Sequence, residues 1–205
     1  MKTVAIIDYG MGNLDSVKRA VEECGGFPFV TNKKSDIQNA THIILPGVGA
    51  FPLAMEALRK SKLDQLLSIQ VIQKKIPFLG LCLGMQLLAK KSFEIKETEG
   101  LGWIDGEVKR LIPKYENERI PHIGWNEIKF INKSPLFDNI PSGKDFYFVH
   151  SYHLICRNKK DILALTPYCG ELVSVIGKDN IFAAQFHPEK SQKVGFQFLK
   201  NFLQL

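Results

Sequence analysis

The chain reads Phe78-Leu79-Gly80-Leu81-Cys82-Leu83-Gly84-Met85-Gln86 near its middle, directly after Pro77. The apolar first part predicts a buried strand. The spacing Gly80-Leu81-Cys82-Leu83-Gly84 is that of a nucleophile elbow, in which small flanking residues let the chain turn sharply and hold a nucleophile above the edge of a sheet. A helix is expected from Leu83 to Lys91. This stretch therefore predicts a strand, an elbow and a helix in direct succession.

Apolar runs with the length of strands alternate with helix-period segments on both sides of the elbow. Strands are predicted at Thr3 to Asp8, Phe27 to Thr31, His42 to Leu45 and Ile181 to Phe186. Helices are predicted at Leu14 to Cys24, over much of Pro52 to Lys75 and at Gln192 to Leu203. This alternation is typical of an α/β fold with a central, mostly parallel sheet that helices flank on both faces.

From Trp103 onward the pattern changes to short apolar runs that lie between turn residues and charged loops. Strands are predicted at Glu107 to Leu111, Glu127 to Ile131, Phe146 to Val149 and Leu172 to Ile176. Because turns rather than long crossovers connect these runs, we expect a smaller antiparallel or mixed sheet in the second half of the chain.

The composition fits a single domain over residues 1–205. Of the 205 residues, 45% are apolar and 23% are charged, which allows one substantial core. No apolar run approaches the roughly 20 residues that span a bilayer, and no secretory leader is recognisable, so we expect a soluble, cytoplasmic protein. The net charge of +6 comes mainly from dispersed lysines, whereas nucleic-acid sites favour clustered arginines with stacking aromatics. We therefore expect neither a membrane nor a nucleic acid as a partner.

The four cysteines lack the close pairing of a structural zinc site and the density of a disulfide scaffold, so reduced thiols are expected. Cys82 differs from the other three because it lies in the elbow. There the backbone N–H of Leu83 could stabilise an oxyanion, and the helix dipole favours a thiolate. A lone cysteine in an apolar run usually packs in the core. The flanking glycines and the strand-to-helix context favour a nucleophile instead.

A thiol nucleophile needs a base, and the chain has five histidines. His42 lies within a predicted strand and is expected to be a satisfied core histidine. His150 and His153 have no third ligand at a usual spacing, so no metal site is expected there.

His187 ends the last predicted strand and precedes Pro188, which favours an extended backbone. In an extended chain His187 and Glu189 point to the same side. The carboxylate could then fix the imidazole tautomer while the other ring nitrogen faces Cys82. Taken alone, this stretch could equally be a strand end with a capping acid for the final helix. Together with an elbow cysteine on a neighbouring strand, it favours a Cys-His-Glu triad.

These residues resemble the class I, or triad, glutamine amidotransferases. The motifs that carry the resemblance to the class are Gly80-Leu81-Cys82-Leu83-Gly84-Met85-Gln86 and Gln185-Phe186-His187-Pro188-Glu189-Lys190-Ser191. Three further blocks resemble the glutaminase subunit of imidazole glycerol phosphate synthase, namely Asp8-Tyr9-Gly10-Met11-Gly12-Asn13-Leu14, Pro46-Gly47-Val48-Gly49-Ala50-Phe51 and Pro121-His122-Ile123-Gly124-Trp125-Asn126. The blocks run from one end of the chain to the other.

The resemblance implies that Cys82 attacks the side-chain amide of glutamine, that His187 transfers the proton and that Glu189 orients His187. The N–H groups implied to form the oxyanion hole belong to Leu83 and to the Gly47-Val48-Gly49 loop, at Gly47 and Val48. The residues implied to hold bound glutamine are Gly49, Gln86, Glu94, Ser151 and Tyr152. The segment Ser92 to Glu99 departs most from the family pattern. No cofactor is implied.

The family's partner is a cyclase subunit with a (β/α)8 barrel, which forms a heterodimer with the glutaminase and receives ammonia through an internal tunnel. The resemblance thus implies the synthesis of imidazole glycerol phosphate and AICAR in histidine biosynthesis. The positions implied to face the partner are Asn13, Trp125, Tyr147 and Lys190.

Three alternative functions stay open from the sequence. A paralogous glutaminase subunit could supply ammonia to a surface-polysaccharide sugar amidotransferase. A regulatory subunit would keep the fold without turnover, which an intact triad argues against. A thiol peptidase or γ-glutamyl hydrolase would need no partner. Ammonia release from glutamine, compared with peptide cleavage, separates these classes.

Overall fold

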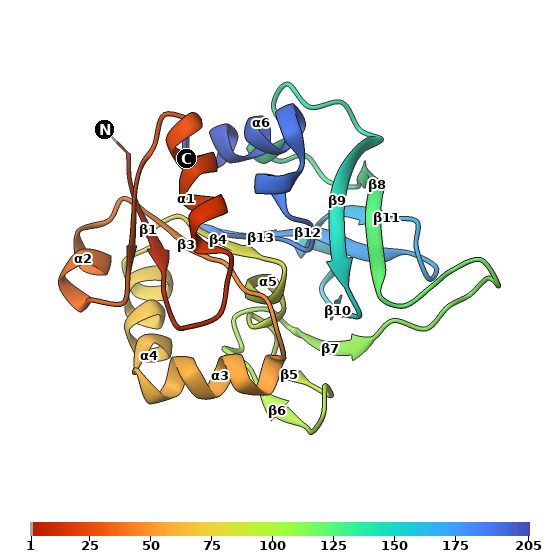
Figure 1. The fold of residues 1–205 in the computed structure, drawn as a ribbon, viewed down its shortest axis with the longest axis horizontal. Coiled ribbons are helices and arrows are strands. Elements are labelled where there is room, and N and C mark those ends of the chain that lie inside the picture. Colours follow the sequence, from red (N-terminus) through yellow and green to blue (C-terminus); the bar gives the residue numbers. More distant parts are fainter. Residues whose placement is uncertain (1) are drawn as a thin grey trace.

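The computed structural model describes residues 2–205 and is built around a nine-stranded sheet with the order β2-β1-β3-β4-β13-β12-β11-β8-β9 (Figure 1). Strand pairs from β2 to β13 are parallel, and those from β13 to β9 are antiparallel. The parallel half contains β1 (Thr3–Ile7), β2 (Phe27–Thr31), β3 (His42–Leu45), β4 (Phe78–Leu81) and β13 (Ile181–Ala184). The antiparallel half contains β8 (His122–Phe130), β9 (Lys144–His150), β11 (Ile162–Thr166) and β12 (Leu172–Lys178).

A smaller sheet of four strands in the order β10-β7-β5-β6 packs beside the large one. Its strands are β5 (Lys91–Ser92), β6 (Thr98–Glu99), β7 (Gly106–Arg110) and β10 (Tyr152–Cys156). The predicted α/β fold with a smaller second sheet is therefore confirmed. Most strands of the second half, however, extend the large sheet, because β13 pairs in parallel with β4 on one side and antiparallel with β12 on the other.

Helices cover both faces of the large sheet. α1 (Leu14–Glu23) and α6 (Gln192–Phe202) lie on one face, which is the upper one in Figure 1. The opposite face is covered by α2 (Lys34–Asn39), α3 (Phe51–Lys60), α4 (Leu63–Ser68), the π-helical turn η1 (Ile69–Gln73) and α5 (Leu83–Gln86). Three 3-10 turns complete the fold, η2 (Pro135–Phe137), η3 (Lys159–Asp161) and η4 (Pro188–Lys190).

The strand β1 shows how the sequence fills two cores at once. Val4 and Ile6 pack in the apolar cluster under α1 and α6, whereas Ala5 and Ile7 pack in the cluster under α3 and α4. Successive side chains of a strand point to opposite faces, so a continuous apolar run is what a strand buried on both faces requires. The same logic explains the apolar runs of β3 and β4.

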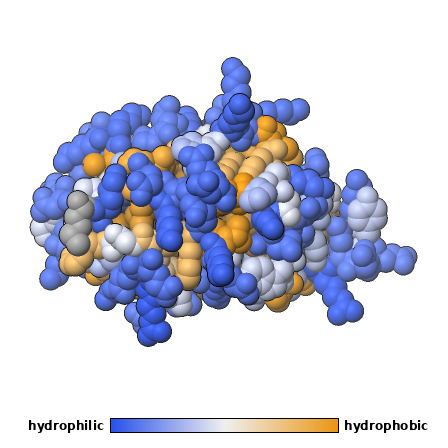
Figure 2. All heavy atoms as spheres, turned by 90° about the horizontal axis from the view of Figure 1, so that it is seen from above, coloured by the Kyte–Doolittle hydropathy of each residue, from blue (hydrophilic) through white to orange (hydrophobic). Residues whose placement is uncertain are grey.

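The outer helices are apolar on one side only. In α1 the buried residues are Val17, Ala20 and Val21, which recur at the three- and four-residue spacing of one helix face. Hydrophilic side chains therefore cover most of the face formed by α1 and α6, with apolar atoms visible between them (Figure 2). None of the helices within residues 2–205 combines the length and the apolar character that a bilayer crossing needs.

The helix predicted from Leu83 to Lys91 is wrong in its length, because α5 ends at Gln86. The carbonyls that would continue the helix accept hydrogen bonds from a different segment. The carbonyl of Leu87 accepts from the N–H of Leu101 at 2.8 Å, and the carbonyl of Ala89 accepts from the N–H of Gly102 at 3.0 Å. The returning chain thus takes over the backbone groups of the second helical turn, which local periodicity could not reveal.

The helical region predicted within Pro52 to Lys75 divides into α3, α4 and η1. The break occurs at Lys62, whose φ of 57° is left-handed, and a left-handed residue cannot continue a right-handed helix. Neither α2 nor the two-residue strands β5 and β6 were predicted from the sequence, since they are too short to show a period.

We predict that Gly84→Ala lowers the free energy of unfolding by at least about 3 kcal/mol, because overpacking against backbone forces the chain to move. A Cβ at Gly84 would lie 1.9 Å from the Leu45 carbonyl oxygen, at the end of β3. Thermal unfolding should show a fall of roughly 10 °C in Tm.

Gly170→Ala is the matched control for this prediction. Gly170 has a φ of 95° and no atom within 4 Å of an added Cβ, so the substitution costs only the left-handed strain of about 1 kcal/mol. Equal melting temperatures for the two variants would contradict the proposed contact between α5 and β3.

Candidate active site

A cavity of about 310 Å³ opens where β4 ends, and it is lined by Cys82 and most of the predicted oxyanion and substrate residues, whereas His187 and Glu189 are not among its lining residues. The residues that line it are Val48, Gly49, Cys82, Leu83, Gln86, Glu94, Val149, His150, Ser151 and Tyr152. All the sequence-predicted oxyanion and substrate residues are in this set except Gly47. In sheets of this kind ligands bind at the carboxyl ends of the parallel strands, which is where this cavity lies.

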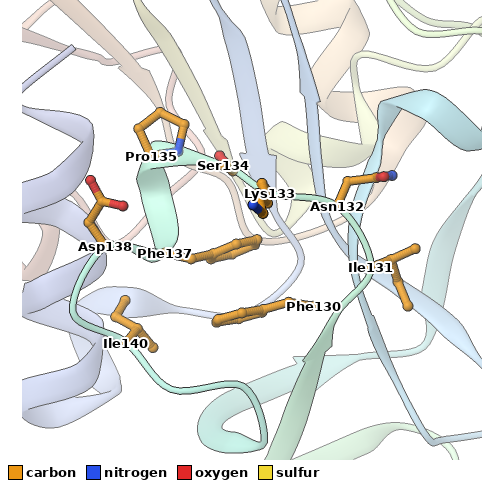
Figure 3. A pocket seen from close by; sticks show the side chains of 9 residues that line it. All are labelled: Phe130, Ile131, Asn132, Lys133, Ser134, Pro135, Phe137, Asp138 and Ile140. Atoms are coloured by element: carbon orange, nitrogen blue, oxygen red, sulfur yellow. The ribbon is translucent and has the colours of Figure 1, made fainter.

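Larger hollows elsewhere lack such chemistry. The hollow in Figure 3 has a volume of about 650 Å³, and its lining includes the rings of Phe130 and Phe137, which stack directly on each other at 3.8 Å between centroids. Lys133 and Asp138 supply the charged groups among its lining residues, which include no cysteine or histidine. The reactive side chains therefore identify the site better than cavity size does.

Cys82 occupies the elbow between β4 and α5. Its φ of 53° and ψ of −109° are rare for a residue with a side chain, and such strain persists only where the surroundings hold it. The N–H of Cys82 donates to the Ala184 carbonyl at 2.8 Å, and its carbonyl accepts from the N–H groups of Met85 and Gln86. These bonds from β13 and α5 fix the thiol at the cavity.

His187 and Glu189 form a buried pair. The Nδ1 atom of His187 lies 2.8 Å from Oε1 of Glu189, and the two side chains are 4% and 2% exposed. The other ring nitrogen, Nε2, is buried and bonds no other group at normal hydrogen-bond distance within residues 2–205. Since β13 lies beside β4 in the sheet, this nitrogen is the one available to the Cys82 thiol.

The charges of the pair favour a protonated imidazole. Burial by itself lowers the pKa of His187. The neighbouring Cys82 side chain and the Glu189 carboxylate outweigh this effect and raise the pKa to about 10. The imidazolium is stable beside these two groups and unstable without them. The arrangement therefore suits a thiolate at Cys82 with a proton held ready on His187.

The backbone around His187 is held by β9. The N–H of His187 donates to the Tyr147 carbonyl at 2.9 Å, and the Ser191 hydroxyl donates to the His187 carbonyl at 2.6 Å. The same hydroxyl oxygen accepts from the N–H of Tyr147 at 3.0 Å. Ser191 is a positioning residue that the sequence reasoning missed, although it ends the motif that contains His187.

Gln86 lines the cavity, and the buried Gln185 lies behind it. The amide nitrogen of Gln86 donates to the Tyr152 carbonyl at 2.8 Å and to Oε1 of Gln185 at 3.1 Å. The amide nitrogen of Gln185 lies 3.7 Å from the sulfur of Cys82. Gln185 was missed as well, yet it precedes His187 by two residues in an extended chain and so shares its side.

Glu94 reaches the cavity although its segment fits the family pattern least. Its Oε2 accepts from the N–H of Phe51 at 2.8 Å, at the first residue of α3. Burial raises the pKa of Glu94, and the bond from Phe51 lowers it in part. A carboxylate near the start of a helix is favourable, so Glu94 both stabilises α3 and presents an acidic group to the cavity.

The backbone around the cavity offers unpaired donors. The N–H groups of Leu83, Val48 and Gly49 donate to no acceptor within residues 2–205. Gly47 packs so closely that an added Cβ would lie 2.5 Å from the Tyr9 hydroxyl. That hydroxyl donates to the Pro46 carbonyl at 2.9 Å. The loop is thus held at its start, whereas its donors near the cavity stay available for an oxyanion.

Three of the four predicted partner-facing residues form one surface cluster. The rings of Trp125 and Tyr147 lie 6.0 Å apart between centroids, and the Lys190 ammonium lies 5.7 Å from the centroid of Tyr147. Trp125 is 47% exposed. Asn13 is exposed at the start of α1, which packs against the η4 turn that contains Lys190.

The remaining histidines are buried, except His153, which is partly exposed, and burial lowers the pKa of each. His42 accepts or donates one bond, with the Thr41 hydroxyl at 2.9 Å, but its buried Nε2 has no partner within residues 2–205. His42 lies in the core as expected, at 1% exposure, with the Phe202 backbone near its second ring nitrogen. Burial lowers the pKa of His42 and of His153 to about 4. No group of three side chains suited to a metal occurs within residues 2–205.

Comparisons with known proteins agree with this geometry. The family model described as glutamine amidotransferase class-I matches residues 5–205. The chain is 46% identical to the imidazole glycerol phosphate synthase subunit HisH 2 of Methanococcus maripaludis, over 98% of each chain. It is 43% identical to the subunit HisH 1 of Campylobacter jejuni strain RM1221, over 98% of this chain and 100% of that one.

Solved structures share the fold at low sequence identity. A putative GMP synthase protein from Thermoplasma acidophilum superposes with a TM-score of 0.74 at 20% identity, covering 100% of this chain and 93% of that chain. The PurLQS structure from Thermotoga maritima gives a TM-score of 0.73 at 16% identity, with coverages of 99% and 96%.

We predict that iodoacetamide at neutral pH labels Cys82 before the other three cysteines. Mass spectrometry of the peptides over time measures the order of labelling. The imidazolium of His187 stabilises the Cys82 thiolate. Burial raises the pKa of the other thiols, to about 11 for Cys24 and Cys156, and upward for Cys169. Glu189→Gln should slow the labelling of Cys82 about tenfold, since a bond to a charged group is lost.

Glu107→Gln serves as the control, because Glu107 pairs with Arg157 in the smaller sheet, away from the cavity lining. It should leave the labelling rate of Cys82 unchanged. Faster labelling of Cys169, which is partly exposed, would show that accessibility rather than the His187–Glu189 pair sets the order.

Proposed function

Since the chain belongs to the class-I glutamine amidotransferases, we propose that it is the glutaminase subunit of an imidazole glycerol phosphate synthase. It hydrolyses glutamine to glutamate and ammonia and passes the ammonia to a cyclase subunit in histidine biosynthesis. The observation that carries the chemistry is the strained Cys82 elbow beside the buried His187–Glu189 pair, which is joined at 2.8 Å. Full-length identity of 46% to a subunit of that synthase supports the pathway.

In the proposed reaction the thiolate of Cys82 attacks the side-chain carbonyl carbon of glutamine. The negative charge that develops on the oxygen is stabilised by the N–H groups of Leu83 and Val48. His187 then gives its proton to the leaving ammonia, and Glu189 keeps the imidazole oriented. Water, with its proton taken by His187, hydrolyses the glutamyl thioester and releases glutamate and the free thiol.

The amino-acid end of glutamine is proposed to bind at the opposite side of the cavity. The groups that could hold the ammonium and carboxylate of the substrate are Gly49, Gln86, Glu94, Ser151 and Tyr152. A carboxylate at Glu94 suits the substrate ammonium, and the backbone of Ser151 suits its carboxylate. The volume of about 310 Å³ admits a small amino acid and leaves no room for an extended peptide, which argues against the peptidase alternative.

The proposed partner is a cyclase with a (β/α)8 barrel that docks on the cluster of Trp125, Tyr147 and Lys190, together with Asn13. Aromatic side chains beside a cation are frequent in interfaces. The backbone carbonyl of Tyr147 also accepts a hydrogen bond from the N–H of His187. A single hydrogen bond therefore joins the proposed docking surface to the proposed triad. The single domain of residues 1–205 would work in the cytoplasm without a cofactor.

We predict that the purified chain and the cyclase form a one-to-one complex that converts glutamine and the phosphorylated ribulosyl intermediate to imidazole glycerol phosphate. Cys82→Ala in the same complex should abolish glutamine-dependent synthesis, because the covalent step is lost. Synthesis from added ammonium salts should persist, since the cyclase chemistry does not need the triad. Product formation by spectrophotometry and ammonia release by a coupled assay measure both reactions.

Glutamine hydrolysis by Cys82→Ala near the wild-type rate would refute the nucleophile assignment. Failure of the wild-type chain to bind the cyclase, together with binding of a sugar-modifying enzyme, would favour the paralogous glutaminase alternative. Peptide cleavage without ammonia release would refute both.

We also predict that the isolated chain hydrolyses glutamine slowly and that partner and acceptor ligand together accelerate it by about 10² to 10³, the range expected for one oxyanion donor. Gly49 has a φ of 113°, so the adjoining peptide can turn its N–H towards or away from the cavity. The measurement is ammonia release with and without the cyclase. An isolated chain as fast as the complex would exclude this gating.

A further inference from the structure

A chain of hydrogen bonds connects the inner face of β8 with the wall of the cavity. The Nδ2 atom of Asn126 lies 3.3 Å from Nε2 of His122, and Nδ1 of His122 lies 3.1 Å from Nε2 of His150. The Nδ1 atom of His150 then lies 2.8 Å from the carbonyl oxygen of Tyr152. His122 and His150 are also directly paired in the antiparallel β8–β9 ladder.

Only one assignment of protons satisfies every bond in this chain. A carbonyl oxygen can only accept, so Nδ1 of His150 carries a proton and donates to Tyr152. Burial lowers the pKa of His150 to about 3 and that of His122 to about 4, so both rings are neutral. The Nε2 atom of His150 must then accept from Nδ1 of His122, and Nε2 of His122 must accept from Asn126.

The two rings are also held in place by packing. His122 stacks on the ring of Tyr168 at 3.9 Å and on the ring of Phe148 at 4.8 Å between centroids. His122 is 3% exposed and His150 is 7% exposed. Because both nitrogens of each ring are already bonded, neither imidazole is free to act as an acid or a base or to bind glutamine. Their role must be indirect.

The inner end of the chain is part of the proposed glutamine cavity. The Tyr152 carbonyl accepts from His150 and also from the amide of Gln86, and Ser151 and Tyr152 line the cavity. The outer end, Asn126, is the neighbour of Trp125 in β8 and lies on the opposite, inner face of that strand. Two bonds on one carbonyl fix the direction of the Tyr152 peptide, and with it the wall that faces the substrate.

We propose that His122 and His150 are positioning residues that hold the Ser151–Tyr152 wall of the glutamine cavity in register with strand β8. This inference rests on the proposed glutaminase function. Movement of β8 on docking of the partner would reach the cavity through this pair. The pair therefore acts on the binding of glutamine and leaves the chemistry of Cys82 and His187 alone.

Two substitutions of the same residue separate the bonds. In His150→Asn the amide nitrogen takes the place of Nδ1 and can still donate to Tyr152. In His150→Gln the amide group takes the place of Nε2, so the bond to His122 can form and the bond to Tyr152 is lost. Loss of the hydrogen bond to the buried Tyr152 carbonyl costs enough free energy to weaken the binding of glutamine about tenfold.

The test uses the chain in complex with its cyclase and measures KM and kcat for glutamine. We expect His150→Gln to raise KM about tenfold with kcat within about threefold, and His150→Asn, which keeps the bond to Tyr152 and loses the bond to His122, to raise KM about threefold. His42→Gln is the control, since it changes another buried neutral histidine outside the cavity. It should alter thermal stability and leave KM unchanged.

A KM for His150→Asn as high as that for His150→Gln, or a wild-type KM in either variant, would overturn the proposal. A wild-type complex that releases no ammonia from glutamine would instead refute the proposed function. Nitrogen NMR of the wild-type imidazoles is independent of activity and of variant folding. At neutral pH it should show the proton on Nδ1 of both His122 and His150, and a proton on Nε2 of either ring would overturn the proposal.

Discussion

Gly84 brings the first turn of α5 so close to the end of β3 that an added Cβ would lie 1.9 Å from the Leu45 carbonyl oxygen. This contact forces the chain to turn within a single residue, and Cys82 takes the left-handed φ of 53° as a result. Cys82, the proposed nucleophile, is therefore held by backbone geometry and not by side-chain contacts alone. Since β4 is bordered by β3 and β13, the same turn places the thiol between the oxyanion loop and the strand that ends near His187.

Strand β9, in the antiparallel half of the sheet, contacts several parts of the proposed site. β9 receives the N–H of His187 at the Tyr147 carbonyl, carries Tyr147 to the surface and ends at His150 beside the cavity. One strand thus touches the proposed general acid, the proposed docking surface and the proposed substrate wall. Displacement of β9 along its length would change all three together, which is a physical route for a partner to control turnover.

Burial of charge is tolerated in this site because each ion has a partner. Removing an imidazolium or a carboxylate from water is costly unless an opposite charge and hydrogen bonds replace the solvent. Glu189, with a side chain only 2% exposed, bonds His187 at 2.8 Å. The His122–His150 pair avoids the cost of a buried charge, because burial lowers the pKa values of both rings and keeps them neutral. Their polar nitrogens are hydrogen-bonded to each other.

The sequence by itself determined the parts of the molecule that depend on neighbouring residues. The elbow at Cys82 follows from its flanking glycines, and the His187–Glu189 pair follows from the two-residue repeat of an extended chain. Only the tertiary structure decided that α5 stops at Gln86, that Glu94 bonds the N–H of Phe51 across 43 positions, and that Gln86 bonds Tyr152 across 66. Such bonds join segments whose distance in space is set by the packing of the whole sheet, and no local periodicity records that distance.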